Sequence, residues 1–169
     1  EGLCDRILNS ERVFVLGMGS AYALAYQFWY VTRMAFGHIT PVPQHGSQPI
    51  DDLALIGPDD LVIAMTFQPY RAETMTAVRL AKQRGAFVVG VTDGATSPLA
   101  LEADEAIVCP TSTPQFFPSQ AAVMGLLETL IAILIARAGE TAQARIEDFH
   151  HERHEAGVYE EDQRLGSLS

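Results

Sequence analysis

The sequence predicts an α/β protein: a three-layer α-β-α sandwich built on a five-stranded, parallel, doubly wound sheet of the flavodoxin-like type. Short β-branched runs alternate along the chain with longer helical stretches, a pattern typical of parallel sheets covered on both faces. One of these runs, Leu61–Met65, contains no charged residue and is therefore expected to be a central strand. In such folds ligands bind outside the carboxyl ends of the strands.

In the first half of the chain, apolar runs and turn residues define two strands and two helices. Residues 13–16 predict a strand closed by a glycine turn, and residues 21–36 predict an apolar helix behind it. Residues 38–42 predict a second strand, which Pro41 marks as irregular or near an edge of the sheet. Residues 49–56 predict a helix that a Gly-Pro pair ends.

The second half of the chain continues the alternation. Gly85 is a natural C-cap for the helix before it, and Pro98 stands in the first turn of a short helix, where its missing N–H costs nothing. The predicted elements are the strands 61–65, 87–91 and 106–109, a helix over 71–84, a short helix from residue 97, a long helix over 119–138 and a polar helix over 141–156.

Length and composition fit one domain of a cytoplasmic protein. The 169 residues are 48% hydrophobic, enough for a full core. The net charge of −10 disfavours direct contact with nucleic acid, so any DNA binding is expected to belong to another part of the protein. Cys4 and Cys109 fit no zinc spacing and are expected to be reduced thiols. The charges of residues 1–12 argue against a signal peptide, and residues 121–136 are too short a run to span a membrane and are expected to form a buried helix.

We expect a single domain over residues 1–169. Its core spans about residues 12–138, a helix follows at about 141–156, and residues 157–169 are expected to form a solvated acidic tail. The abrupt start at Glu1 suggests a piece of a longer protein.

The glycine turn after the first strand is the first candidate site. Gly17, Gly19 and Ser20 lead into a helix at Ala21, and such a loop presents backbone N–H groups and a helix N-terminus to an anion. A dinucleotide fingerprint needs a third glycine where this chain has Tyr22. We therefore expect no NAD and no other cofactor. A tight turn without a ligand is the alternative.

The loop after the third strand is the second candidate site. Thr66 and Gln68 can donate hydrogen bonds, and Arg71 can bind a phosphate through two N–H groups. The alternative is ordinary helix capping, with Arg71 solvated. Two such loops at the ends of adjacent strands favour a shared anion site.

These motifs, in this order and spacing, resemble the SIS (sugar isomerase) domain family. They are Gly-x-Gly-Ser after the first strand, the loop from Thr66 to Glu73, and Val91-Thr92-Asp93 followed by Ser-Pro-Leu-Ala at 97–100. The resemblance runs from about residue 13 to residue 138 and implies the SIS fold and a phosphorylated sugar as the ligand. In that family the loop after the third strand usually reads Ser-x-Ser-Gly-x-Thr-x-Glu. This chain instead has glutamine, proline and arginine at the second, third and fourth conserved positions.

The form Thr-Phe-x-x-Tyr-x-x-Glu is similar to the effector domains of RpiR-type transcriptional regulators. The resemblance implies a sensor in which a phosphosugar controls DNA binding by an N-terminal helix-turn-helix domain that this chain lacks. It also implies homodimers or homotetramers, with a sugar site that takes residues from two subunits. The residues expected to bind the phosphosugar are Gly19, Ser20, Ala21, Ser47, Thr66, Phe67, Gln68, Arg71 and Ser119. For Ser47 and Ser119 the alternative is a helix N-cap.

An aldose–ketose isomerase acting through an enediol is the enzyme alternative, and it needs a base beside the sugar. The candidates are Glu128, Glu147 and His150. Glu128 stands inside an apolar helix, where pairing with an arginine is the structural alternative. His150 and His154 are four residues apart, but Glu155 breaks the zincin pattern, so we expect no metal. A dimerisation module whose pocket has lost its ligand is a third alternative.

Overall fold

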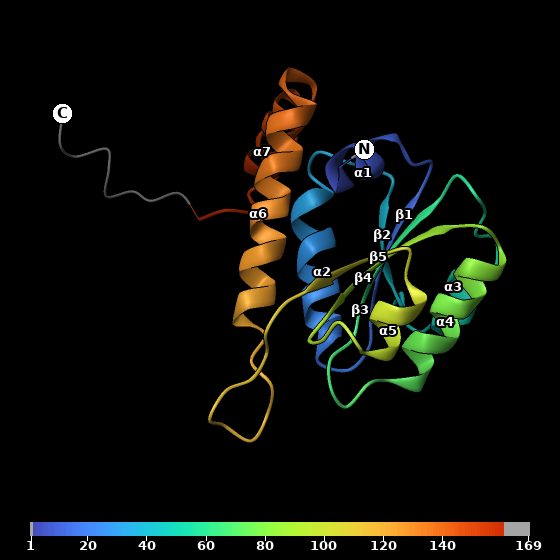
Figure 1. Ribbon diagram of the computed structural model, residues 1–169. Coiled ribbons are helices and arrows are strands. Elements are labelled where there is room, and N and C mark those ends of the chain that lie inside the picture. The colour runs from blue at the N-terminus through green and yellow to red at the C-terminus, as the bar shows by residue number, and fades with distance from the viewer. Residues whose placement is uncertain (1, 161–169) are drawn as a thin grey trace.

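The computed structural model describes residues 2–160 and shows one parallel five-stranded sheet (Figure 1). The strands lie in the order β2–β1–β3–β4–β5, and every neighbouring pair is parallel. They are β1 (Val13–Gly17), β2 (Ile39–Val42), β3 (Leu61–Met65), β4 (Phe87–Thr92) and β5 (Glu105–Val108). The helices are α1 (Leu3–Asn9), α2 (Ala21–Thr32), α3 (Pro49–Asp52), α4 (Ala72–Gln83), α5 (Pro98–Glu102), α6 (Ala121–Ala138) and α7 (Glu140–Glu155).

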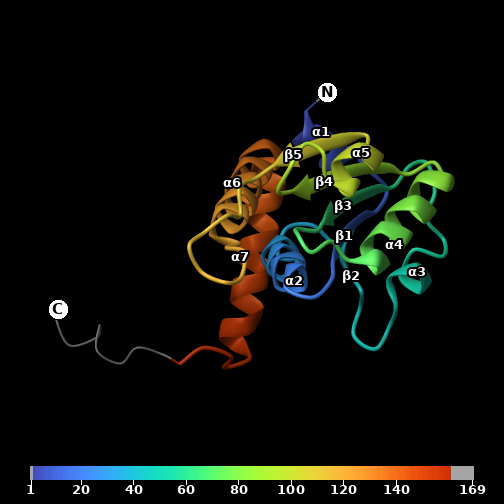
Figure 2. The same ribbon diagram turned by 60° about the horizontal axis from the view of Figure 1, so that its bottom comes forward.

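The helices form a layer on each face of the sheet, which confirms the predicted α-β-α sandwich. Helices α1, α2, α6 and α7 lie on one side, and α3, α4 and α5 lie on the other (Figures 1 and 2). Successive side chains of a strand point to opposite faces, so Val13 and Val15 of β1 join the core under α2, while Phe14 and Leu16 join the core under α4. Strands β1 to β4 each contribute to both cores in this way, and this explains why they carry so few polar residues.

The observed elements differ from the predicted ones mainly at the ends of helices. Helix α2 ends at Thr32, four residues early, and the Thr32 hydroxyl donates to the carbonyl of Phe28 at 2.7 Å. Helix α3 has only four residues, and Gln48 rather than Ser47 is its N-cap. Helix α1 was not predicted: it buries only Cys4 and Ile7, one turn apart, and seven residues are too few to show a helical period. Of the predicted acidic tail, residues 161–169 lie outside the described residues.

Helix α6 is apolar on more of its surface than the rest of the molecule covers. Of the window Ala121–Ala138, 28% is buried, so the expectation of a buried helix is wrong for the single chain. Val123, Leu127 and Leu134 face the core, while Ile133 is 42% exposed. By length and composition alone α6 could cross a membrane, and core helices pass the same test. In this structure α6 packs on α2, α1 and α7, while its outer face, including Ile133, stays exposed.

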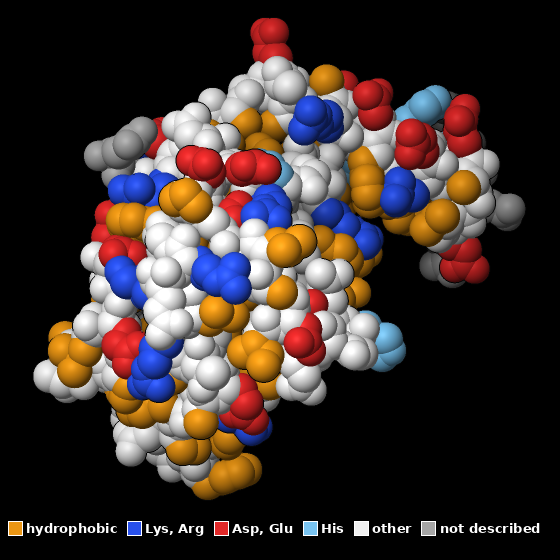
Figure 3. All heavy atoms as spheres, turned by 90° about the vertical axis from the view of Figure 1, so that its right-hand side faces the viewer, with side chains coloured by type: hydrophobic (Ala, Val, Ile, Leu, Met, Phe, Trp, Pro, Cys, Tyr) orange, Lys and Arg blue, Asp and Glu red, His pale blue; other side chains and the backbone are white. Residues whose placement is uncertain are grey.

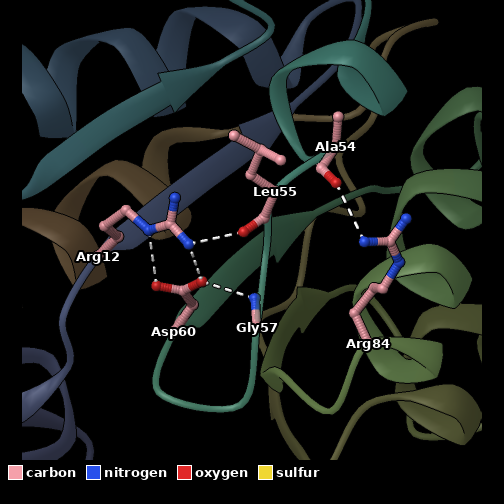
Figure 4. Close-up of polar contacts among 6 residues, drawn as sticks. All are labelled: Arg12, Ala54, Leu55, Gly57, Asp60 and Arg84. Atoms are coloured by element: carbon pink, nitrogen blue, oxygen red, sulfur yellow. Dashed lines mark hydrogen bonds and ion pairs between the residues drawn. The ribbon is translucent and has the colours of Figure 1, made fainter.

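An ion pair with a buried carboxylate fixes the end of the sheet opposite the candidate site. Arg12, just before β1, binds Asp60, just before β3, through Nε–Oδ1 (2.9 Å) and Nη2–Oδ2 (2.6 Å) (Figure 4). The Asp60 side chain is 2% exposed and also accepts the N–H of Gly57 at 2.7 Å. Arg12 donates further to the carbonyl of Leu55. The pair therefore ties the starts of two adjacent strands to the loop before β3.

The outer face of α3, α4 and α5 is the polar face of the domain. Figure 3 shows acidic and basic side chains interspersed over it. Two ion pairs join α4 to residues around α5: Arg79 with Glu102, and Lys82 with Asp104. Burial alone would raise the pKa of Asp104, but hydrogen bonds from Lys82 and from the N–H of Val88 outweigh it and hold that pKa below its usual value. The Asp104 carboxylate is therefore a stabilising charge.

Replacing Arg12 should destabilise the fold, because it leaves the buried Asp60 carboxylate without its charged partner. We expect Arg12→Ala to lower the free energy of unfolding by about 2 to 4 kcal/mol in a urea titration. The matched control is Arg79→Ala, which breaks a more exposed pair and should cost less than about 1 kcal/mol. Equal losses for the two variants would contradict the role given to Asp60.

Asp104→Asn should remove part of the loss of stability on acidification. A carboxyl with a lowered folded pKa contributes stability above its ordinary pKa, and that contribution is lost as the pH falls through the folded value. The variant should therefore be less stable than the wild type by about 1 to 2 kcal/mol at neutral pH, with the gap closing below about pH 4. Thermal unfolding between neutral and acidic pH measures this. Asp59→Asn, at an exposed carboxylate, is the control, and a gap independent of pH would refute the assignment.

Candidate functional site

The loops after β1 and β3 meet at the carboxyl end of the sheet, as the sequence predicts. The β1 loop makes its turn with almost no room to spare, because a Cβ atom on Gly17 would lie 2.3 Å from the carbonyl oxygen of Ala21. Gly19 has a φ of 61°, in the left-handed region that glycine adopts at low cost. Ser20 follows at the N-terminus of α2, where backbone N–H groups favour an anion.

The guanidinium of Arg71 lies against Gly19 and brings the two loops together. A Cβ atom on Gly19 would be 2.9 Å from Arg71 Nη2 and 3.1 Å from its Nε. The Arg71 side chain is 54% exposed, and Glu73 is 3.9 Å away, too far for a close ion pair. Arg71 therefore holds its charge at the mouth of the glycine loop with N–H groups available.

The β3 loop is fixed by polar contacts from within and from the next strand. The buried hydroxyl of Thr66 accepts the N–H of Arg71, the N-cap residue of α4, at 3.3 Å. Asp93, after β4, accepts the N–H of Gln68 and the hydroxyl of Tyr70, both at 3.0 Å. Burial and the hydrogen bond to Asp93 raise the pKa of Tyr70, so its hydroxyl remains a donor. Asp93 thus anchors the loop that carries Arg71.

The long loop between β5 and α6 closes the site from a third side. In Figure 1 this loop extends below α6, near the carboxyl ends of the strands. Gln120 Nε2 donates to the hydroxyl of Ser20 at 2.8 Å, across 100 positions of sequence. The enclosed cavity has a volume of about 310 Å³. It is lined by Met18, Ser20, Ala21, Thr66, Phe67, Gln68, Pro69, Tyr70, Arg71, Phe117, Pro118 and Gln120.

A second cavity, of about 360 Å³, adjoins the first. It shares Gln68, Phe117 and Pro118 with the first cavity and continues past Asp93 to the hydroxyl-bearing loop residues 111–113. The two cavities lie in a size range that small-molecule ligands fill. Within the described lining of the first cavity, Arg71 is the sole charged side chain, and neither a carboxylate nor an imidazole occurs there. The site can therefore hold an anion among neutral donors.

The structure gathers most of the sequence-predicted binding residues at this cavity. Ser20, Ala21, Thr66, Phe67, Gln68 and Arg71 line it, and Gly19 lies against Arg71. Ser47 is not in its lining, and its hydroxyl is 3.5 Å from the carbonyl of Gln48. Ser119 is not in the lining either, and its hydroxyl accepts the N–H of Ala121 at 3.3 Å, close to the capping role given as its alternative.

The three candidate bases lie elsewhere in this chain. Glu128 is exposed and lines a different, mostly apolar cavity between α2 and α6. No arginine pairs with it among the described residues, so the structural alternative given for Glu128 is wrong. Glu147 and His150 are exposed on α7, where His150 Nδ1 is 3.4 Å from the Tyr159 hydroxyl. Between residues 2 and 160 no group of three or more metal-ligating side chains comes together.

Sequence reasoning missed four residues that shape the site: Tyr70, Asp93, Phe117 and Gln120. Asp93 stood in a recognised motif, and its position after β4 was a usable signal. Phe117 and Gln120 belong to the irregular segment between β5 and α6, which has three prolines between residues 110 and 118. No local pattern shows that this segment folds back over the glycine loop.

Comparison with known proteins identifies the family. The sequence pattern of the SIS domain matches residues 6–139. The chain belongs to the SIS domain family. Among solved structures, the sugar isomerase domain of an RpiR transcription factor from Sphaerobacter thermophilus has a TM-score of 0.80 and 27% identity, covering 88% of this chain and 83% of that one.

Two further proteins are similar to this chain. The Vibrio vulnificus NanR protein complexed with ManNAc-6P has a TM-score of 0.77 and 18% identity, covering 91% of this chain and 59% of that one, and its likeness supports the fold. A glutamine–fructose-6-phosphate aminotransferase [isomerizing] from Pyrobaculum aerophilum is 29% identical over 104 residues. These residues are 62% of this SIS domain but only 17% of that enzyme, so the chain spans a small part of that curated relative.

Gly19→Ala should disturb both the backbone and the position of Arg71. A side chain in the left-handed region costs about 1 to 2 kcal/mol, and the new Cβ would force the guanidinium away. We expect a loss of that size in the free energy of unfolding, together with weaker anion binding. Gly37→Ala is the control, since its Cβ would meet nothing within 4 Å and its φ is not in the left-handed region. Equal behaviour of the two variants would contradict the contact between Gly19 and Arg71.

Proposed function

We propose that this SIS domain is the phosphosugar-binding effector domain of a cytoplasmic transcriptional regulator, and that it controls DNA binding by an N-terminal helix-turn-helix domain outside this chain. The observation that carries the proposal is the guanidinium of Arg71 held against Gly19 at the mouth of the cavity. One cation, a helix N-terminus and neutral donors suit a phosphate monoester with a hydroxylated body. The likeness to the RpiR domain supports the regulator.

The lining of the cavity favours a sensor over an enzyme. Proton transfer between the sugar carbons of an aldose and a ketose needs a base within hydrogen-bonding reach, and the described lining of the 310 Å³ cavity contains neither carboxylate nor imidazole. Asp93, in the adjoining cavity, already accepts hydrogen bonds from Gln68 and Tyr70. The groups present can bind and orient a phosphosugar without moving its protons.

A phosphosugar isomerase is the second candidate, because the aminotransferase relative is described as isomerizing. In that case the base comes from a second subunit, and Glu128, Glu147 or His150 of that subunit would supply it. We propose that the domain forms homodimers or homotetramers, since the bare outer face of α6 is the kind of apolar surface that subunit interfaces cover. Each subunit would then complete the other's sugar site.

Arg71→Ala should weaken binding of phosphosugars. Loss of a charged hydrogen bond costs about 1.5 to 3 kcal/mol, so the dissociation constant should rise by roughly 10 to 150 times. Calorimetric titration with the phosphosugar that stabilises the wild-type protein most in a thermal-shift screen measures this change. Arg79→Ala, an exposed arginine on the polar face, is the control. Unchanged affinity in Arg71→Ala would make Arg71 a surface residue.

Incubation of the protein with aldose and ketose phosphates in deuterated water separates the two candidates. A sensor leaves the proton at C2 in place, whereas an isomerase acting through an enediol exchanges it for deuterium. We expect no exchange above the protein-free control, measured by proton NMR. Exchange that Glu128→Gln abolishes would establish the enzyme instead. No binding of any phosphosugar would leave the dimerisation module as the function.

A further inference from the structure

A separate cavity lies between the C-terminal ends of α2 and α7. Its volume is about 460 Å³, and none of its lining residues belongs to the two cavities at the carboxyl end of the sheet. Tyr30 and Arg33 line it from the α2 side, and Phe149, Arg153 and Tyr159 line it from α7 and the segment that follows. The charged and aromatic groups of its lining are three rings, two guanidinium groups and the Glu152 carboxylate, in a chain with a net charge of −10.

Arg33 is the unusual residue of this pocket. Its guanidinium carbon lies 4.1 Å from the ring centroid of Tyr30 and 5.0 Å from that of Trp29. Its Nε is buried and has no hydrogen-bond partner. Within residues 2–160 the Arg33 guanidinium has neither a hydrogen-bond acceptor nor an ion-pair partner. Cation–π contacts hold such a group in place but leave its N–H groups unsatisfied, which is costly without an acceptor.

The second arginine of the pocket, Arg153, already has partners within the protein. Arg153 stacks 3.3 Å from the ring centroid of Phe149, donates to the carbonyl of Phe149 at 3.2 Å and pairs with Glu152 at 3.6 Å. The unbalanced charge in the pocket is therefore that of Arg33. Tyr30 and Tyr159, 41% and 45% exposed, offer further ring surface beside it.

We propose that this cavity is a second binding site, for a small organic anion that carries an aromatic ring. A carboxylate or a phosphate ester would accept the free N–H groups of Arg33, and the ring would pack against the tyrosines. The cavity volume lies in the range that small-molecule sites occupy. The proposal does not depend on the function proposed for the sugar site, because the two sites share no residue.

Phenyl phosphate and benzoate test the site, and the molecule contains its own reporter. Trp29 is the single tryptophan of the chain, and Arg33 lies over its ring. An anion that draws the guanidinium toward itself should change the tryptophan fluorescence in a saturable way. We expect such a change with phenyl phosphate or benzoate at millimolar concentrations, and a much smaller one with phenol or inorganic phosphate.

Substitutions show which residues bind the probe. Binding to these variants is measured by titration calorimetry, because replacing Arg33 itself changes the fluorescence of Trp29. Arg33→Gln should weaken the best probe by about tenfold or more, as loss of a charged hydrogen bond does. Arg33→Lys keeps the charge without the planar fork and should lie between the two, which guards against a folding defect in Arg33→Gln. Arg79→Ala and Arg71→Ala, both outside this cavity, should bind with less than about a threefold change.

Four results would overturn the proposal. Equal affinity in wild type and Arg33→Gln would remove the arginine from the site. Binding of inorganic phosphate as tight as that of phenyl phosphate would exclude the aromatic class of ligand. Displacement of phenyl phosphate by a sugar phosphate, or its loss in Arg71→Ala, would mean that the probe occupies the sugar site. Absence of any saturable binding would also end the proposal.

Discussion

The turn from β1 into α2 has no room for a side chain at Gly17, where a Cβ atom would lie 2.3 Å from the carbonyl oxygen of Ala21. Because the strand and the helix approach each other this closely, the first turn of α2 begins directly at the carboxyl end of β1. The Ser20 hydroxyl then accepts a hydrogen bond from Gln120, which is 100 residues later in the chain. Gly19, which has no side chain, lets the guanidinium of Arg71 lie against its backbone. The other contacts of the candidate site presuppose this turn.

The fold was predictable because a strand that is buried on both faces of a sheet appears in the sequence as an uninterrupted apolar run. The run Leu61–Met65 lies between two polar residues and coincides with β3 to the residue. Helix α1 was not predicted, since seven residues cannot display a helical period, and the helix predicted over 49–56 ends already at Asp52. For α6 the composition showed that a face needs cover, but it could not show whether the same chain supplies that cover.

The residues of the candidate site that directly follow a strand were predictable, and those placed by contacts between distant loops were not. Ser20, Thr66 and Arg71 follow strand ends, so parallel pairing of β1 and β3 was enough to bring them together. Asp93 and Gln120 act through contacts with other loops, and their roles depend on how those loops fold. The position of the candidate bases outside the cavity of their own chain was not predictable for the same reason, because helix spacing does not tell which cavity a side chain such as Glu128 lines.

The position of Pro41 in β2 bears on how copies of this domain can associate. Strand β2 is an edge of the sheet and has only four residues, one of them a proline that has no N–H to donate. A short, proline-bearing edge is a poor template for an incoming strand and protects against runaway strand-to-strand aggregation. Growth of a continuous intermolecular sheet is thus disfavoured at this edge.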